Sequence, residues 1–96
     1  MAILQACAVL DVAVGAYNRP FFVPSLGLAV RSFEDECTRA APDNAMFNHP
    51  KDFSLFHVGS FDEESGRFTN LDNPHRLVDA VSVVKFKEIK HGTSEA

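Results

Sequence analysis

The four histidines could supply a metal site or a general base, because imidazole does both near neutral pH. They are His49, His57, His75 and His91. No two of them are four residues apart and none adjoins a cysteine, so their spacing fits no common zinc site. His57 falls in the middle of an expected strand and is interpreted as a packed or surface side chain. We therefore predict no metal ion.

The acidic run Asp62-Glu63-Glu64 and the two cysteines are the other candidates for chemistry. The acidic run lacks the alternating ligands and the closing glutamate of a calcium loop, and a solvated turn explains it better. Cys7 and Cys37 belong to no motif with a catalytic histidine, and buried free thiols in a reducing compartment are predicted. We predict no enzymatic activity and no cofactor. A nuclease that uses the acidic residues is the remaining enzymatic alternative.

Aromatic and basic residues could bind nucleic acid. In Arg19-Pro20-Phe21-Phe22, exposed rings beside an arginine could stack on bases, as in single-strand binders. The favoured alternative is that both rings pack under a helix or in a dimer contact, because a small domain needs its aromatic side chains. Lysines near the C-terminus could contact phosphate or keep the tail soluble. The candidate nucleic-acid-binding residues are Arg19, Phe21, Phe22, Arg31, Lys85, Lys87 and Lys90.

Composition limits the class of protein. The 96 residues include nine phenylalanines and no tryptophan, and the net charge is −4. This charge argues against a polybasic nucleic-acid coat but allows a local basic patch. No stretch is long and apolar enough to span a bilayer, so we expect no membrane contact and a cytoplasmic location. A chain this short buries about two thirds or less of its unfolded surface, and a homodimer is therefore expected.

The elements that must position these residues centre on a hairpin over residues 52–71. Two aromatic-rich runs flank an acidic turn that ends at Gly66, where a positive φ is allowed. Neither face of the first run is cleanly polar, so this strand should be central in its sheet. Alternation predicts one face with Phe53, Leu55, His57, Gly59 and Phe61, and another with Ser54, Phe56, Val58 and Ser60.

Residues 26–39 carry the clearest helical pattern, with Ser25 as N-cap and Pro42 beyond the end. The apolar stripe of this helix is Leu26, Ala29, Val30, Phe33 and Cys37. Residues 3–10 are interpreted as a buried strand, and 18–25 and 41–51 as loops.

The C-terminal part is read as a second helix followed by a strand. Asn73 and Pro74 are typical of a short helix start, and residues 81–86 favour a strand. The prediction is one α+β domain over residues 1–86, followed by a polar tail over 87–96. Its small antiparallel sheet contains the hairpin and is packed by one main helix and a short second one.

Four segments together resemble the small non-structural protein family of gokushovirus-type microviruses, which are tailless phages with single-stranded DNA genomes. The segments are Arg19-Pro20-Phe21-Phe22-Val23-Pro24, Leu28-Ala29-Val30-Arg31-Ser32-Phe33, His49-Pro50-Lys51-Asp52-Phe53-Ser54-Leu55-Phe56, and Val58-Gly59-Ser60-Phe61-Asp62 with Gly66. The resemblance covers most of residues 11–84. It implies an accessory protein absent from the virion, without a catalytic motif, in the host cytoplasm.

Two functions follow as hypotheses. The resemblance implies a non-enzymatic role in viral single-stranded DNA synthesis and packaging, through viral replication or packaging proteins or through DNA. The alternative is a dimeric protein that binds single-stranded DNA directly with the candidate residues named above, in a salt-sensitive manner.

Overall fold

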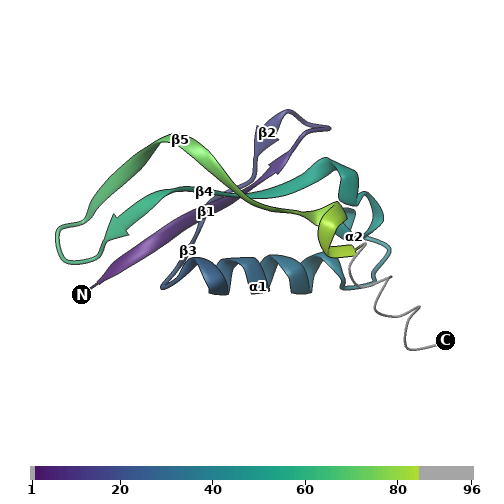
Figure 1. Cartoon of the computed structure of the whole chain (residues 1–96), viewed down its shortest axis with the longest axis horizontal. Helices are drawn as coiled ribbons and strands as arrows, with labels where there is room; N and C mark the ends of the chain where they lie inside the picture. Colours follow the sequence, from purple (N-terminus) through teal and green to yellow (C-terminus); the bar gives the residue numbers. More distant parts are fainter. Residues whose placement is uncertain (1, 85–96) are drawn as a thin grey trace.

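The computed structural model describes residues 2–84 and has the predicted α+β architecture. One antiparallel sheet carries helix α1 (Leu26–Cys37) on one side (Figure 1). Its strands are β1 (Ile3–Asp11), β2 (Ala16–Tyr17), β3 (Phe21–Val23), β4 (Phe53–Asp62) and β5 (Arg67–Asp79). No helix within the described part of the chain is long and apolar enough to cross a membrane.

The order of the sheet is β2-β1-β4-β5, and β3 also pairs with β1. β2 pairs with β1 at Leu10 and Asp11, whereas β3 pairs with it at residues 5–7. These two short strands therefore form one interrupted edge strand. The prediction of a loop throughout residues 18–25 is wrong at β3: Pro20 and Pro24 lie outside the paired residues, so neither has to donate a ladder hydrogen bond.

The predicted hairpin is confirmed as β4 and β5, and β4 lies between β1 and β5 in the sheet. Gly66 closes the turn with φ +73°, and its amide donates to the carbonyl oxygen of Asp62 at 2.7 Å. A residue with a Cβ rarely adopts this φ, which explains a glycine at the end of an acidic turn.

The main helix is also confirmed, with an end two residues earlier than expected. The Oγ of Ser25 accepts from the amide of Leu28, as an N-cap does. Ala29, Phe33 and Cys37 are buried against the sheet, where Leu55 of β4 is fully buried. Both cysteines are buried free thiols, as predicted.

Residues 41–51 are not loop throughout, because they contain a short helix α2 (Ala45–Asn48) and the start of a 3₁₀ turn, Pro50–Asp52. Asn44 is buried and links this segment to α1. Its Oδ1 accepts from the amide of Met46, and its Nδ2 donates to the carbonyl oxygens of Glu36 and Arg39.

The predicted helix start at Asn73 and Pro74 is wrong, because β5 runs through both residues. They lie in a stretch between Asn70 and His75 that has no register partner on β4. Proline is tolerated there, since an outer strand does not need every amide. The predicted strand over 81–86 is also wrong in its described part: residues 80–84 are helical, and the remainder lies outside the described residues.

The alternation predicted for β4 fails at Val58. Ala6 and Cys7 are consecutive in β1 but pair with Gly59 and His57, so Val58 is an extra residue, a β-bulge. Beyond this bulge, Gly59 and Phe61 lie on the same face as Phe56, not on the face of Phe53 and Leu55. The burial agrees, because Phe53 and Leu55 belong to the core under α1 and Phe61 does not.

Candidate nucleic-acid interface

The face of the sheet opposite α1 carries five aromatic side chains, which we call the aromatic face. Among the described residues no helix covers it (Figure 1). Register partners in a sheet point to the same side, and every second residue of β1 does so too. The partners of Leu4, Ala6, Ala8 and Leu10 therefore share a face. The aromatic face consists of Tyr17, Phe22, Phe56, Phe61 and Phe68.

Three of these rings form one cluster. The ring centroid of Phe61 lies 5.9 Å from that of Phe22 and 4.8 Å from that of Phe68. Phe22 and Phe68 are themselves 6.1 Å apart, centroid to centroid. Phe68 is 66% exposed and Phe22 is 42% exposed. Large rings that stay this accessible are free to stack on a ligand.

The other two rings form a second cluster with an arginine. Tyr17 meets Phe56 edge to face at 5.5 Å, and the guanidinium of Arg76 lies 5.0 Å from the centroid of Phe56. Arg76 also pairs with Asp79. This arrangement places the guanidinium over an aromatic ring, where a cation–π contact holds it, and the carboxylate of Asp79 balances its charge.

Ser54 and Asp79 fix the orientation of Arg76. The Nη1 of Arg76 donates to the Oγ of Ser54 at 2.9 Å, and this Oγ donates to the Oδ1 of Asp79 at 2.7 Å. The hydrogen bond from Ser54 and the one from Arg76 lower the pKa of Asp79 below its ordinary value. The carboxylate therefore stays charged and keeps the arginine in place.

Two small residues lie between the clusters. Ala6 and Gly59 are register partners in adjacent strands, and both are buried although no helix in the described part of the chain lies over them. Next to them is a hollow of about 170 Å³, which is bounded by Phe22, Phe68 and Asn70. A Cβ on Gly59 would collide with the carbonyl oxygen of Thr69, so the close approach of β4 and β5 requires glycine here.

His57 holds the bulge that places Phe61 on the aromatic face. Its Nε2 is 3.0 Å from the carbonyl oxygen of Gly59 and 2.9 Å from the Oε1 of Gln5. A carbonyl oxygen only accepts, so Nε2 carries the hydrogen. This agrees with the interpretation of His57 as a packed side chain. Within residues 2–84, no group of three His, Cys, Asp or Glu side chains could hold a metal ion.

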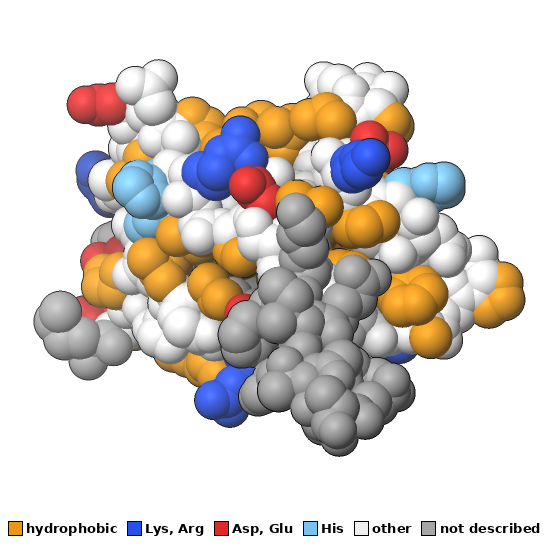
Figure 2. Space-filling view, turned by 45° about the vertical axis from the view of Figure 1, so that its right-hand side comes forward, with side chains coloured by type: hydrophobic (Ala, Val, Ile, Leu, Met, Phe, Trp, Pro, Cys, Tyr) orange, Lys and Arg blue, Asp and Glu red, His pale blue; other side chains and the backbone are white. Residues whose placement is uncertain are grey.

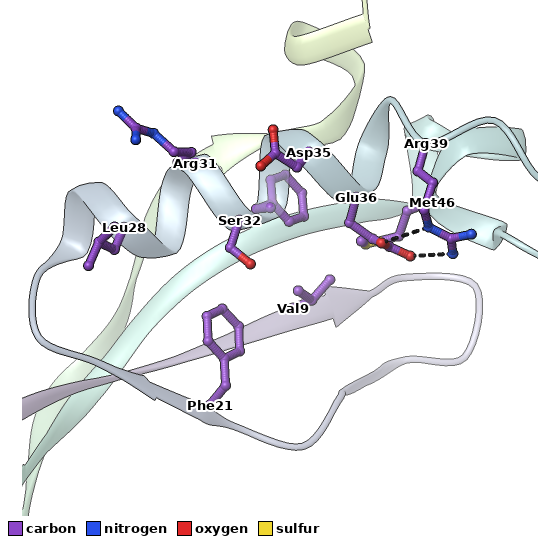
Figure 3. Close-up of a pocket in the computed structure, with 10 residues that line it drawn as sticks. Val9, Phe21, Leu28, Arg31, Ser32, Asp35, Glu36, Arg39 and Met46 are labelled. Carbon is purple, nitrogen blue, oxygen red and sulfur yellow. Dashed lines mark hydrogen bonds and ion pairs between the residues drawn. The ribbon is translucent and has the colours of Figure 1, made fainter.

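The structure separates the candidate residues that the sequence indicated. Phe22 lies on the aromatic face, whereas its neighbour Phe21 pairs with Cys7 and packs against the core. Figure 3 shows Phe21 under α1, while the guanidinium of Arg31 points away from it. Arg19 is exposed just before Pro20, which borders the hollow. Lys85, Lys87 and Lys90 lie outside the described residues.

Another hollow, drawn in Figure 3, brings two of the candidates together, because both Phe21 and Arg31 line it. It measures about 610 Å³ and lies between α1 and the sheet, with Val9 and Phe21 on one side and Glu36 on the other. The carboxylate of Glu36 pairs with Arg39 at 2.7 Å, which neutralises both charges. In the view of Figure 2, Lys and Arg side chains lie near Asp and Glu side chains.

Sequence reasoning missed Tyr17, Phe56, Phe61, Phe68 and Arg76 as members of one surface. One signal in the sequence could have indicated this surface. Ala6 and Ala8 are alternate residues of β1, so both lie on one face of the sheet, and their small side chains leave room there for large rings. The strand register and the bulge are needed to bring those rings together, and neither can be read from the pattern alone.

The fold and this surface define a small α+β protein that presents aromatic side chains on the face of an antiparallel sheet opposite its main helix. The family model described as Phage ORF5 protein matches residues 4–83, and the chain belongs to this phage protein family. No curated protein and no solved structure matches the chain.

Proposed function

We propose that this phage protein binds single-stranded DNA through the aromatic face, as a non-enzymatic accessory protein of a gokushovirus-type microvirus. The proposed origin in such a virus rests on the resemblance described above and on the membership of the chain in a phage protein family. In this proposal the protein acts in the host cytoplasm during viral DNA synthesis and genome packaging. Viral replication or packaging proteins are its other partners.

The observation that carries the proposal is the exposure of Phe22 and Phe68 beside Phe61 on a face that no helix of residues 2–84 covers. Unpaired bases stack on aromatic side chains displayed by sheets, and each stacked base contributes about 1–3 kcal/mol without a strong sequence requirement. Double-stranded DNA keeps its bases inside the duplex. The same rings therefore distinguish single strands from duplexes.

Charge supports a stacking mechanism with few phosphate contacts. The net charge of the chain is −4, so non-specific attraction to DNA is weak. Arg19 is exposed close to the aromatic face and is the phosphate contact in the proposal, because Arg76 is already paired with Asp79. One contact on a single strand corresponds to a slope of about −0.7 in log K against log salt concentration.

The test is a fluorescence anisotropy titration with a labelled single-stranded oligonucleotide and with the matching duplex, over a series of salt concentrations. We expect the wild type to prefer the single strand, and Phe68→Ala to weaken binding about five- to 150-fold. Phe47→Ala is the matched control, because Phe47 is an exposed ring on α2 and not on the aromatic face. Absence of binding at low salt, or equal affinity for the duplex, would overturn the proposal.

A second copy of this chain is the other candidate for the aromatic face. Exposed aromatic rings are typical of protein interfaces, and a homodimer is expected for so short a chain. A mass measurement in solution separates the two occupants. A dimer that Phe68→Ala converts to a monomer, without DNA binding by either variant, assigns the face to self-association.

A further inference from the structure

We infer that the hollow between Phe22 and Asn70 binds one unstacked nucleobase, with the Asn70 amide as its polar contact. This inference rests on the proposed function, because it assigns a subsite within the aromatic face. It adds a contact that is made by hydrogen bonding and not by stacking.

The hollow follows from one row of residues across four strands. Phe22 of β3 pairs with Ala6 of β1, Ala6 pairs with Gly59 of β4, and Gly59 pairs with Asn70 of β5. All four residues therefore point to the aromatic face. The two middle positions, Ala6 and Gly59, are the smallest residues of the row. The surface is therefore hollowed between the ring of Phe22 at one end and the amide of Asn70 at the other.

The walls fit a flat, partly polar ligand. Phe22 and Phe68 stand at one side with their rings 6.1 Å apart and 46° tilted, and both border the hollow of about 170 Å³. These rings offer an apolar surface for the plane of a base. Asn70 is exposed at the other side, beyond Gly59.

The chemistry of the amide matches the edge of a base. An asparagine side chain presents a donor and an acceptor side by side. Each nucleobase presents donors and acceptors on its Watson–Crick edge, which is free only in single strands. Asn70 would thus recognise the Watson–Crick edge of a base whose plane contacts Phe22 and Phe68. A paired base of a duplex could not enter the hollow, because its edge is already occupied.

The test compares Asn70→Leu with the wild type in anisotropy titrations using four single-stranded homopolymers. Asn73→Leu is the matched control, because Asn73 is an exposed asparagine of the same strand outside the hollow. Loss of one or two hydrogen bonds should weaken binding about three- to 30-fold in Asn70→Leu alone. NMR of the wild type gives a second readout: the Ala6 methyl signal should shift on addition of the oligonucleotide.

The outcomes separate the inference from the function that it rests on. Binding that Asn70→Leu does not weaken, with an unmoved Ala6 signal, overturns the subsite and leaves DNA binding by the aromatic face intact. No binding of any oligonucleotide by the wild type overturns both. If Asn70→Leu fails to fold, the Ala6 signal of the wild type still decides, since a base elsewhere on the face would leave it unmoved.

Discussion

Phe22 and Phe68 come from strands that are not neighbours, yet their ring centroids lie 6.1 Å apart on the face opposite α1. Both rings border the hollow that also contains Ala6 and Gly59, whose small size leaves that space open. This contact ties the edge strand to the tip of the hairpin. It also creates the most exposed aromatic cluster on the aromatic face.

This contact should be visible as an energetic coupling. In a double-mutant cycle with Phe22→Ala and Phe68→Ala, we expect a coupling of about 0.5–1.5 kcal/mol in the free energy of unfolding, measured by urea denaturation. Phe22→Ala combined with Phe47→Ala should be additive, because Phe47 belongs to α2. If the effects of Phe22→Ala and Phe68→Ala on the free energy of unfolding were also additive, the contact between the two rings would be contradicted.

The bulge at Val58 should depend on His57. Replacing His57 by leucine removes the donor to the Gly59 carbonyl oxygen and to the Gln5 side chain, and should cost about 1–3 kcal/mol in urea denaturation. His57→Gln, which restores a donor, should recover part of this loss. His75→Leu is the control, because His75 is the exposed cross-strand partner. A His57→Leu protein as stable as the wild type would show that the bulge does not need this donor.

Asp79 should make stability depend on acid pH. Its pKa is lowered in the folded chain by the hydrogen bond from Ser54 and by Arg76. The charged form therefore stabilises the fold above the unfolded pKa of about 3.9, and this contribution is lost as the pH falls through the lower folded pKa. Asp79→Asn should flatten the decline of Tm between about pH 5 and pH 2. Asp72→Asn, an exposed aspartate of the same strand, is the control; equal slopes in Asp79→Asn and wild type would refute the role.

The two thiols should be unreactive in the folded protein. Burial, and then the charges of Glu36 and Glu34, raise the pKa of Cys37 to about 11, and burial raises the pKa of Cys7. At pH 8 only about one Cys37 in a thousand is a thiolate. Ellman's reagent should therefore label neither cysteine in buffer and both in urea. Cys37→Ser assigns the signal, and immediate labelling of the native protein would contradict the burial.

Local patterns determined the helix and the strands beside it. The stripe ending at Cys37, the Ser25 cap and the apolar run of β1 depend on neighbours close in the chain, and so does the turn at Gly66. The resemblance to phage proteins was carried by short segments in order along the chain. These features needed no knowledge of which strands pair.

The aromatic face was decided by tertiary structure alone. One extra residue at Val58 turns Phe61 to the side of Phe56, and pairing with β1 sends Phe21 and Phe22 to opposite sides of the sheet. β5 runs through Pro74 because an outer strand tolerates a residue that has no N–H to donate. Pairing with β4 on either side of this proline therefore overrides the local helix signal. A side chain's face depends on register, and register is set by partners far away in the chain.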